Sequence, residues 1–160
     1  MAFWNGIFGR QGEKLGAPVS GEAIPLKEVK DEAFSSGMLG EGLAIIPDGA
    51  RLVAPCMGMV DVLMETGHSV TLKTNGGAQV LMHIGLDTVK LGGKHFGVRC
   101  AAGQKVQRGQ TLIEFDREAI EKDGYDPVVV MVMPDGANIA KTVTGRQVAE
   151  GETVICLAAH

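Results

Sequence analysis

Two short sequence units each occur twice in this chain. "APVSGEAIPL" (17–26) and "APCMGMVDVL" (54–63) share A-P-x-x-G and a later leucine, while "GQKVQRGQTLI" (103–113) and "GRQVAEGETVI" (145–155) share G-x-x-V-x-x-G-x-T-x-I. Glycine permits a tight turn, and the apolar residues that alternate after it are typical of a strand. Two copies of each unit, with many short strands, predict an all-β fold that is a closed or flattened sandwich.

Few stretches favour a helix. The segment "FDREAIEKDG" (115–124) is the best candidate, because Asp116 can cap its start and Gly124 can end it. The segment "DPVVVMVMPD" (126–135) is a near-continuous apolar run between two turn signals, which predicts a central strand buried on both faces. We therefore expect an antiparallel β-sandwich or barrel-like fold with only short helical turns.

Length and composition indicate one globular domain. The chain has 160 residues, of which 45% are hydrophobic and 21% are charged, and a chain of this size can bury a core without disulfides or metal. We expect residues 17–160 to form the domain and residues 1–16 to be a flexible N-terminal segment. The net charge of −4 argues against nucleic acid as a partner.

The cysteines and the apolar segments indicate the cellular compartment of the protein. Cys56, Cys100 and Cys156 are odd in number and form no C-x-x-C arrangement, which predicts reduced, mostly buried thiols in a cytoplasmic protein. No signal peptide is apparent, and no apolar run approaches the ~20 residues of a transmembrane helix. Near the N-terminus, four apolar residues are spaced to share one helix face (Phe3, Trp4, Ile7 and Phe8), so weak membrane contact through residues 1–10 is one hypothesis. Two glycines in that stretch favour a frayed tail instead.

One histidine interrupts an otherwise apolar strand. The segment "QVLMHIGLDTV" (79–89) places His83 in a run that is bounded by the turn signal "TNGG" (74–77). A core histidine with one satisfied hydrogen bond is the simplest interpretation of this pattern alone.

The preceding hairpin brings a second histidine close. Asn75-Gly76 favours a type I′ turn, and if these residues form its tip, His68 directly faces His83, with Cβ atoms ~4.5–5.5 Å apart. An odd-length loop or a bulge would shift the pairing. Two adjacent imidazoles are not both comfortably protonated, so at least one should be neutral near pH 7. Such a pair suits a zinc site, general acid–base chemistry or a phosphorylated histidine with a stabilising neighbour.

Several of these segments together resemble a known family. "HIGLDTVKLGGKHF" (83–96), "ETGHSVTL" (65–72), "APVSGEAIPLKEV" (17–29), "MLGEGLAIIP" (38–47) and "GQKVQRGQTLIEFD" (103–116) look like the glucose-family enzyme IIA of the bacterial phosphoenolpyruvate-dependent sugar phosphotransferase system. The likeness covers roughly residues 17–157. It implies an antiparallel β-sandwich with a duplicated hybrid motif, and a phosphocarrier that needs no cofactor. Because no IIB-like cysteine motif or IIC-like membrane span is present, the resemblance implies a free-standing IIA protein.

The resemblance also implies roles for individual residues. His83 would be phosphorylated on Nε2 by the histidine phosphocarrier protein HPr and would pass the group to a cysteine of a IIB domain. His68 would stabilise the phosphoryl group, held by Thr66, and the backbone carbonyl of Gly85 would orient His83. Asp31 and Asp87 would pair with basic side chains of the partners. Without the resemblance, the simplest interpretation of Asp31 is a solvated loop charge and that of Asp87 is a turn-forming residue. Some members of that family also regulate permeases or a kinase. The residues of this chain do not show whether it does so.

Two other classes compete with this interpretation. Lysostaphin-like zinc peptidases also carry H-x-x-x-D, matched by His83 and Asp87, but they need an H-x-H pair that this chain lacks. Lipoyl- or biotinyl-type carriers would explain "GQKVQRGQ", but they need D-K-A or M-K-M, and neither tripeptide occurs. Zinc bound by His68 and His83, completed by a partner's carboxylate, remains a third hypothesis.

Overall fold

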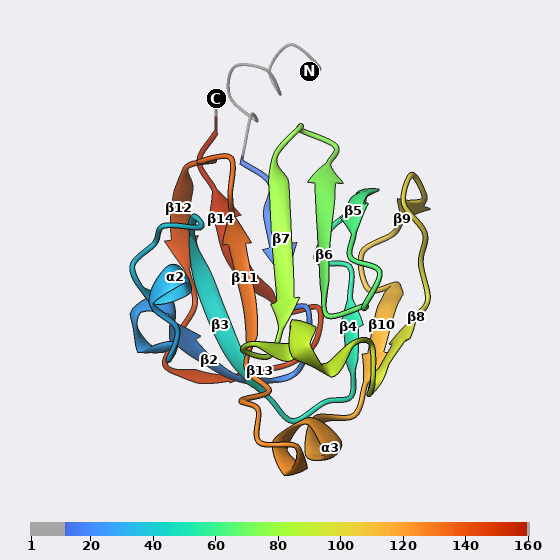
Figure 1. The fold of residues 1–160 in the computed structure, drawn as a ribbon. Helices are drawn as coiled ribbons and strands as arrows, with labels where there is room; N and C mark the ends of the chain where they lie inside the picture. The colour runs from blue at the N-terminus through green and yellow to red at the C-terminus, as the bar shows by residue number, and fades with distance from the viewer. Residues whose placement is uncertain (1–11, 160) are drawn as a thin grey trace.

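The computed structural model describes residues 12–159, and its strands form one large and two small sheets (Figure 1). All the strand pairs within these sheets are antiparallel. The large sheet has the order β13 (Arg146–Val148), β2 (Gly21–Pro25), β3 (Glu41–Pro47), β11 (Val129–Met133), β7 (Gln79–Ile84), β6 (Ser69–Thr74), β5 (Gly58–Leu63) and β9 (Lys105–Val106). The small sheets are β1 (Lys14–Gly16), β14 (Thr153–Leu157) and β12 (Ile139–Thr142), and β4 (Arg51–Val53), β10 (Thr111–Phe115) and β8 (Phe96–Val98).

Helical structure in the described residues is short, as predicted. It consists of the 3₁₀ turns η1 (Leu26–Glu28) and η2 (Thr88–Leu91) and the α-helices α2 (Glu32–Ser35) and α3 (Arg117–Lys122). The predicted helix is confirmed as α3: the Asp116 carboxylate accepts a hydrogen bond from Ala119 N at 3.1 Å, and Gly124, with φ +92°, follows its end. The single turn α2 was not predicted. None of these helices is long and apolar enough to cross a membrane.

The sequence repeats occupy equivalent places in the fold. The residue before each A-P unit donates a backbone hydrogen bond to the proline carbonyl of the other unit, from Gly16 N to Pro55 O and from Val53 N to Pro18 O, both at 2.8 Å. Each A-P unit also receives a hydrogen bond from the turn of the other repeat type, from Gly109 N to Ala54 O (2.8 Å) and from Gly151 N to Ala17 O (2.9 Å). The predicted turn glycines have φ of +89° at Gly109 and +84° at Gly151. The duplication therefore places two similar units against each other.

The predicted boundary between tail and domain differs from the structure. Residues Lys14–Gly16 form β1, which pairs with β14, and Leu15 is fully buried. The first repeat unit begins only at Ala17, so the repeats do not reveal this strand. The apolar residues Phe3–Phe8 and the suggested membrane contact lie outside the described residues.

The central strand β11 separates two apolar clusters, as the continuous run in the sequence predicts. All five of its residues are buried, and it lies between β3 and β7. Val129, Met131 and Met133 belong to the main core between the sheets. Val130 and Val132 belong to a second cluster on the other face, which includes Phe34 of α2. This second face matters because Val130 pairs with His83 of β7.

The β6–β7 register differs by one residue from the prediction. Ser69, not His68, pairs with His83, and Lys73 pairs with Gln79. The turn has an odd length: Thr74 N donates to Ala78 O at 2.8 Å, and its positive φ is at Gly77 (+92°) rather than at the two residues before it. The predicted type I′ turn is therefore wrong, for the reason that an odd-length loop shifts the pairing.

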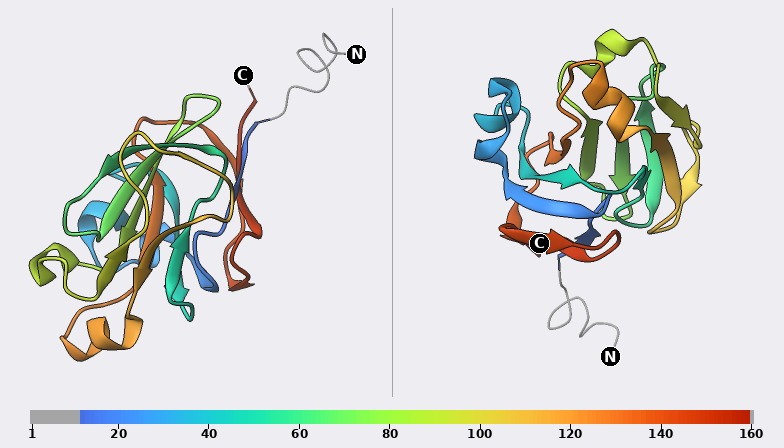
Figure 2. Two further views of the ribbon diagram at one scale, coloured as in Figure 1. Left: turned by 90° about the vertical axis from the view of Figure 1, so that its right-hand side faces the viewer. Right: turned by 90° about the horizontal axis from the view of Figure 1, so that it is seen from below.

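Figure 1 and the left view of Figure 2 place η2 and α3 at the end of the molecule away from the β6–β7 turn. The strand β7 runs from that turn towards η2, so His83 and the loop after it lie near the η2 end (Figure 1). The three cysteines are unpaired, as predicted, with Cys56 buried and Cys100 and Cys156 partly buried.

Candidate functional site

The two predicted histidines are neighbours despite the shifted register. Their ring centroids are 5.0 Å apart with an interplanar angle of 79°, an edge-to-face arrangement. His68 directly precedes β6 in the chain. Its carbonyl still accepts a hydrogen bond from Ile84 N at 2.7 Å, and this bond joins the start of β6 to the end of β7. His68 is 4% exposed and His83 is partly buried.

The backbone after β7 defines the protonation of His83. Its Nδ1 lies 2.7 Å from the carbonyl oxygen of Gly85. A carbonyl can only accept, so Nδ1 carries the proton and donates it. In the neutral ring, Nε2 then keeps a free lone pair and is the nucleophilic atom.

Position 85 requires glycine. Its φ is +80°, and a Cβ there would lie 2.4 Å from Thr88 Cγ2 and 3.0 Å from the Asp126 carbonyl oxygen. Both the backbone conformation and the packing exclude other residues. The glycine of the histidine motif is thus explained by the turn that carries its carbonyl to His83.

His68 is held from its other side by Thr66. The Thr66 hydroxyl lies 2.5 Å from His68 Nδ1. Between them, Gly67 has φ +76°, and a Cβ on it would lie 2.9 Å from the Val98 side chain. Because Nδ1 is occupied by Thr66, the other ring nitrogen of His68, Nε2, is the one available for a further hydrogen bond.

The acidic residues predicted at the site lie on two separate loops. Asp31 caps α2, where its carboxylate accepts from Ala33 N at 2.9 Å. This helical turn carries Phe34, whose ring centroid is 5.2 Å from that of His83. Asp87 is exposed, directly precedes η2 as its N-cap and has φ +59°. Phe34 is a site residue that the sequence analysis missed, because its contact with His83 joins elements far apart in the chain.

Electrostatics keep both histidines neutral near pH 7. Burial, together with the adjacent His68, lowers the pKa of His83 to about 4, although the Gly85 carbonyl and the charges of Asp31 and Asp87 oppose the shift. Burial also lowers the pKa of His68 below its usual value. The pair therefore offers an unprotonated nucleophile across the neutral pH range.

The buried thiols are poor alternatives as nucleophiles. Burial raises the pKa of Cys56 to about 11, and it also raises that of Cys100. Only the thiolate form reacts, so these cysteines are inert near neutral pH.

The stability of the protein is expected to depend on His83 below pH 6.5. The unfolded chain binds a proton there with a pKa near 6.5, whereas the folded chain binds it only near 4. Stability attributable to this group is therefore complete above pH 6.5 and falls as the pH decreases towards 4, by about 3 kcal/mol. Urea unfolding of the wild type and of His83→Gln at pH 7, 6 and 5 measures it. The wild type should lose more stability, and parallel losses would contradict the assigned shift.

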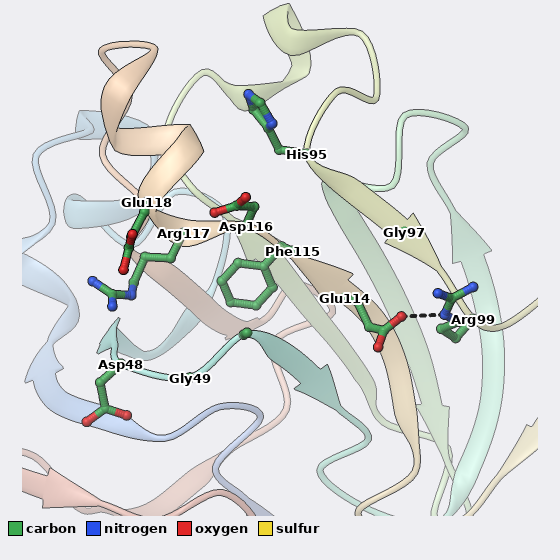
Figure 3. Close-up of a pocket in the computed structure, with 11 residues that line it drawn as sticks. Asp48, Gly49, His95, Gly97, Arg99, Glu114, Phe115, Asp116, Arg117 and Glu118 are labelled. Atoms are coloured by element: carbon green, nitrogen blue, oxygen red, sulfur yellow. Dashed lines mark hydrogen bonds and ion pairs between the residues drawn. The ribbon is translucent and has the colours of Figure 1, made fainter.

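A pocket elsewhere on the surface does not involve the predicted site residues. It is lined by residues of β10, α3 and the loop before β4, and Figure 3 shows charged side chains of both signs around it, with Arg99 paired to Glu114 at 2.5 Å. His95, at its edge, has Nε2 2.8 Å from an Asp123 carboxylate oxygen. The His95 imidazole is thus bound to Asp123 and is not part of the His68–His83 pair.

The described residues, 12–159, contain no group of three or more histidine, cysteine or carboxylate side chains that could hold a metal ion. A zinc peptidase needs three protein ligands and an open position. His68 and His83 therefore do not form a complete metallopeptidase site.

Comparison with known proteins is consistent with this geometry. Residues 13–139 match the family model of the phosphoenolpyruvate-dependent sugar phosphotransferase system, EIIA 1. A solved structure, glucose permease IIA from Mycoplasma capricolum, aligns with a TM-score of 0.85 and 32% sequence identity over 93% of this chain and 97% of that chain.

Curated relatives are longer proteins. A beta-glucoside-specific EIIBCA component of Halalkalibacterium halodurans is 48% identical over 121 residues, which are 74% of this chain and 19% of that protein. One from Dickeya chrysanthemi is 41% identical over 137 residues, 84% of this chain and 22% of that protein. A glucose-specific EIIBCA component of Corynebacterium glutamicum is 39% identical over 139 residues, 87% of this chain and 20% of that protein. The chain thus spans about a fifth of the length of these relatives.

Proposed function

The chain belongs to the EIIA 1 family of the phosphoenolpyruvate-dependent sugar phosphotransferase system, and we propose that His83 carries its phosphoryl group. EIIA domains are phosphotransferase components, so the chain is a phosphocarrier. The observation that supports His83 is the 2.7 Å hydrogen bond from its Nδ1 to the Gly85 carbonyl, which leaves Nε2 free to attack.

The proposed donor is the histidine phosphocarrier protein HPr. His83 Nε2 attacks the phosphorus of the donor's phosphohistidine, a P–Nε2 bond forms, and the donor ring leaves as a neutral imidazole with its electron pair. The His83 ring keeps its proton on Nδ1 and becomes positively charged. The Gly85 carbonyl stabilises that charge, since it already accepts from Nδ1.

The proposed acceptor is a cysteine thiolate of a IIB domain. It attacks the same phosphorus, a P–S bond forms, and His83 returns to the neutral form with Nδ1 protonated. His68 acts during both steps: with Thr66 on its Nδ1, its Nε2–H can donate to a phosphoryl oxygen. The relatives named EIIBCA components carry an EIIB part beside the EIIA part, which supports a IIB partner for this chain.

The surface around His83 fits transfer between two proteins. His83 is partly exposed at a strand end, and Asp87 is exposed beside it. Together with Asp31, it places negative charge near the nucleophile, which suits partners with basic side chains. We therefore propose that the chain acts in the cytoplasm.

The function is tested by incubating the full chain with phosphoenolpyruvate, enzyme I and HPr and measuring its intact mass. We expect one acid-labile phosphoryl group per chain, and none when HPr is omitted. An unlabelled chain in the presence of phosphorylated HPr would reject this donor. Metal analysis would then test the remaining hypothesis, zinc at His68 and His83.

A further inference from the structure

The loop after β7 contains a buried polar side chain that the proposed chemistry does not use. Thr88 is fully buried, and its hydroxyl donates a hydrogen bond to the Ile84 carbonyl. Its methyl carbon, Cγ2, fills the space where a Cβ on Gly85 would lie, at 2.4 Å. Both ends of this side chain therefore contact the residues that surround the Gly85 carbonyl.

Hydrogen bonds fix both peptide groups that flank Gly85. The peptide after it, which includes the carbonyl bound to His83, is held because Leu86 N donates to Asp126 O at 2.9 Å. The peptide before it is held at both ends: Gly85 N donates to Val128 O at 2.7 Å, and the Ile84 carbonyl accepts from Thr88. Of these three hydrogen bonds, the one from Thr88 is made by a side chain, and the other two join backbone groups.

The peptide groups on both sides of residue 85 need these hydrogen bonds because residue 85 is a glycine. Gly85 has φ +80° and no Cβ, so its own conformational preferences do not define the directions of the two peptides. Asp87, with φ +59°, adds a second left-handed residue to the same short loop. A loop of this kind needs contacts from outside to hold one conformation.

We propose that Thr88 is a positioning residue of the phosphoryl carrier: its hydroxyl holds the Ile84–Gly85 peptide and so keeps the Gly85 carbonyl on His83 Nδ1. The inference rests on the proposed function of His83. Thr88 does not touch the reacting atoms. It selects the tautomer of His83 in which Nε2 is free.

Two substitutions separate the hydroxyl from the methyl group. Thr88→Ser keeps the hydroxyl, and Thr88→Ala removes both groups; each is smaller than threonine, so neither overpacks the core. Thr74→Ala is the matched control. Thr74 is also buried, at 4% exposure, and its hydroxyl donates to Glu13 at 2.6 Å, but it lies at the other end of the same hairpin.

The first readout is the tautomer of His83, from ¹⁵N chemical shifts of the imidazole in the unphosphorylated protein. Wild type, Thr88→Ser and Thr74→Ala should keep the Nδ1–H form. In Thr88→Ala the Nε2–H form should increase by about tenfold, the change that loss of one hydrogen bond can produce. This readout needs no phosphoryl donor, so it can fail or succeed independently of the proposed function.

The second readout is the rate of phosphoryl acceptance at equal folded concentration. It should fall by about tenfold in Thr88→Ala and recover in Thr88→Ser, while Thr74→Ala stays within about twofold of the wild type. An unchanged His83 tautomer in Thr88→Ala would overturn the proposal. Equal rate losses in Thr88→Ala and Thr74→Ala would also overturn it, because they would indicate general destabilisation.

Discussion

The His83→Ala variant is expected to take up no phosphoryl group under conditions that label the wild type completely. Alanine has no nucleophilic atom, and the buried cysteines cannot substitute for the imidazole because their thiols stay protonated. The rate should fall by at least about a thousandfold, as expected when a nucleophile is removed. Intact mass after incubation with phosphoenolpyruvate, enzyme I and HPr measures it.

His95→Ala is the matched control for this loss. His95 is a third histidine in the described residues, and its Nε2 is bound to Asp123 rather than directed to the His68–His83 pair. It should be labelled as fast as the wild type. Label retained in His83→Ala, or lost in His95→Ala with the fold intact, would contradict the assignment of the nucleophile.

The His68→Gln variant is expected to separate labelling from transfer. Its nucleophile is intact, so excess phosphorylated HPr should still label it to completion. Passage of the group to a IIB domain should slow by about a hundredfold, the effect typical of losing one donor to a charged transition state. A quenched time course with the labelled variant and a IIB domain gives this rate.

The control here is the wild-type rate with the same IIB preparation, together with His95→Gln. Onward transfer from His68→Gln at the wild-type rate would remove His68 from the chemistry and leave it a packing role against His83. If His68→Gln is not labelled at all, that result would indicate that the phosphoryl group passes through His68.

The sequence predicted the elements of the site better than their exact pairing. Glycine turns, the repeats and the apolar run of β11 have local causes, and these predictions are confirmed. The β6–β7 register could not be read from Asn75-Gly76, because a loop with one more residue moves the positive φ to Gly77. The histidines still meet, with ring centroids 5.0 Å apart, although Ser69 and not His68 pairs with His83.

Long-range contacts were the part that the sequence did not reveal. Phe34 reaches His83 from a helical turn about fifty residues earlier, and no periodicity connects the two. The aspartate that caps this turn was expected at the partner interface, and the cap gives it a structural contact as well. Thr88 lies in the quoted motif, but its burial and its bond to Ile84 depend on how the loop folds back.

The most direct test of the account is the position of the phosphorus on His83. NMR of the ¹⁵N-histidine protein after labelling resolves the ³¹P–¹⁵N coupling to each ring nitrogen. Because Nδ1 donates its proton to Gly85, we predict coupling to His83 Nε2 and a protonated Nδ1. Coupling to His83 Nδ1, or to either nitrogen of His68, would contradict the mechanism.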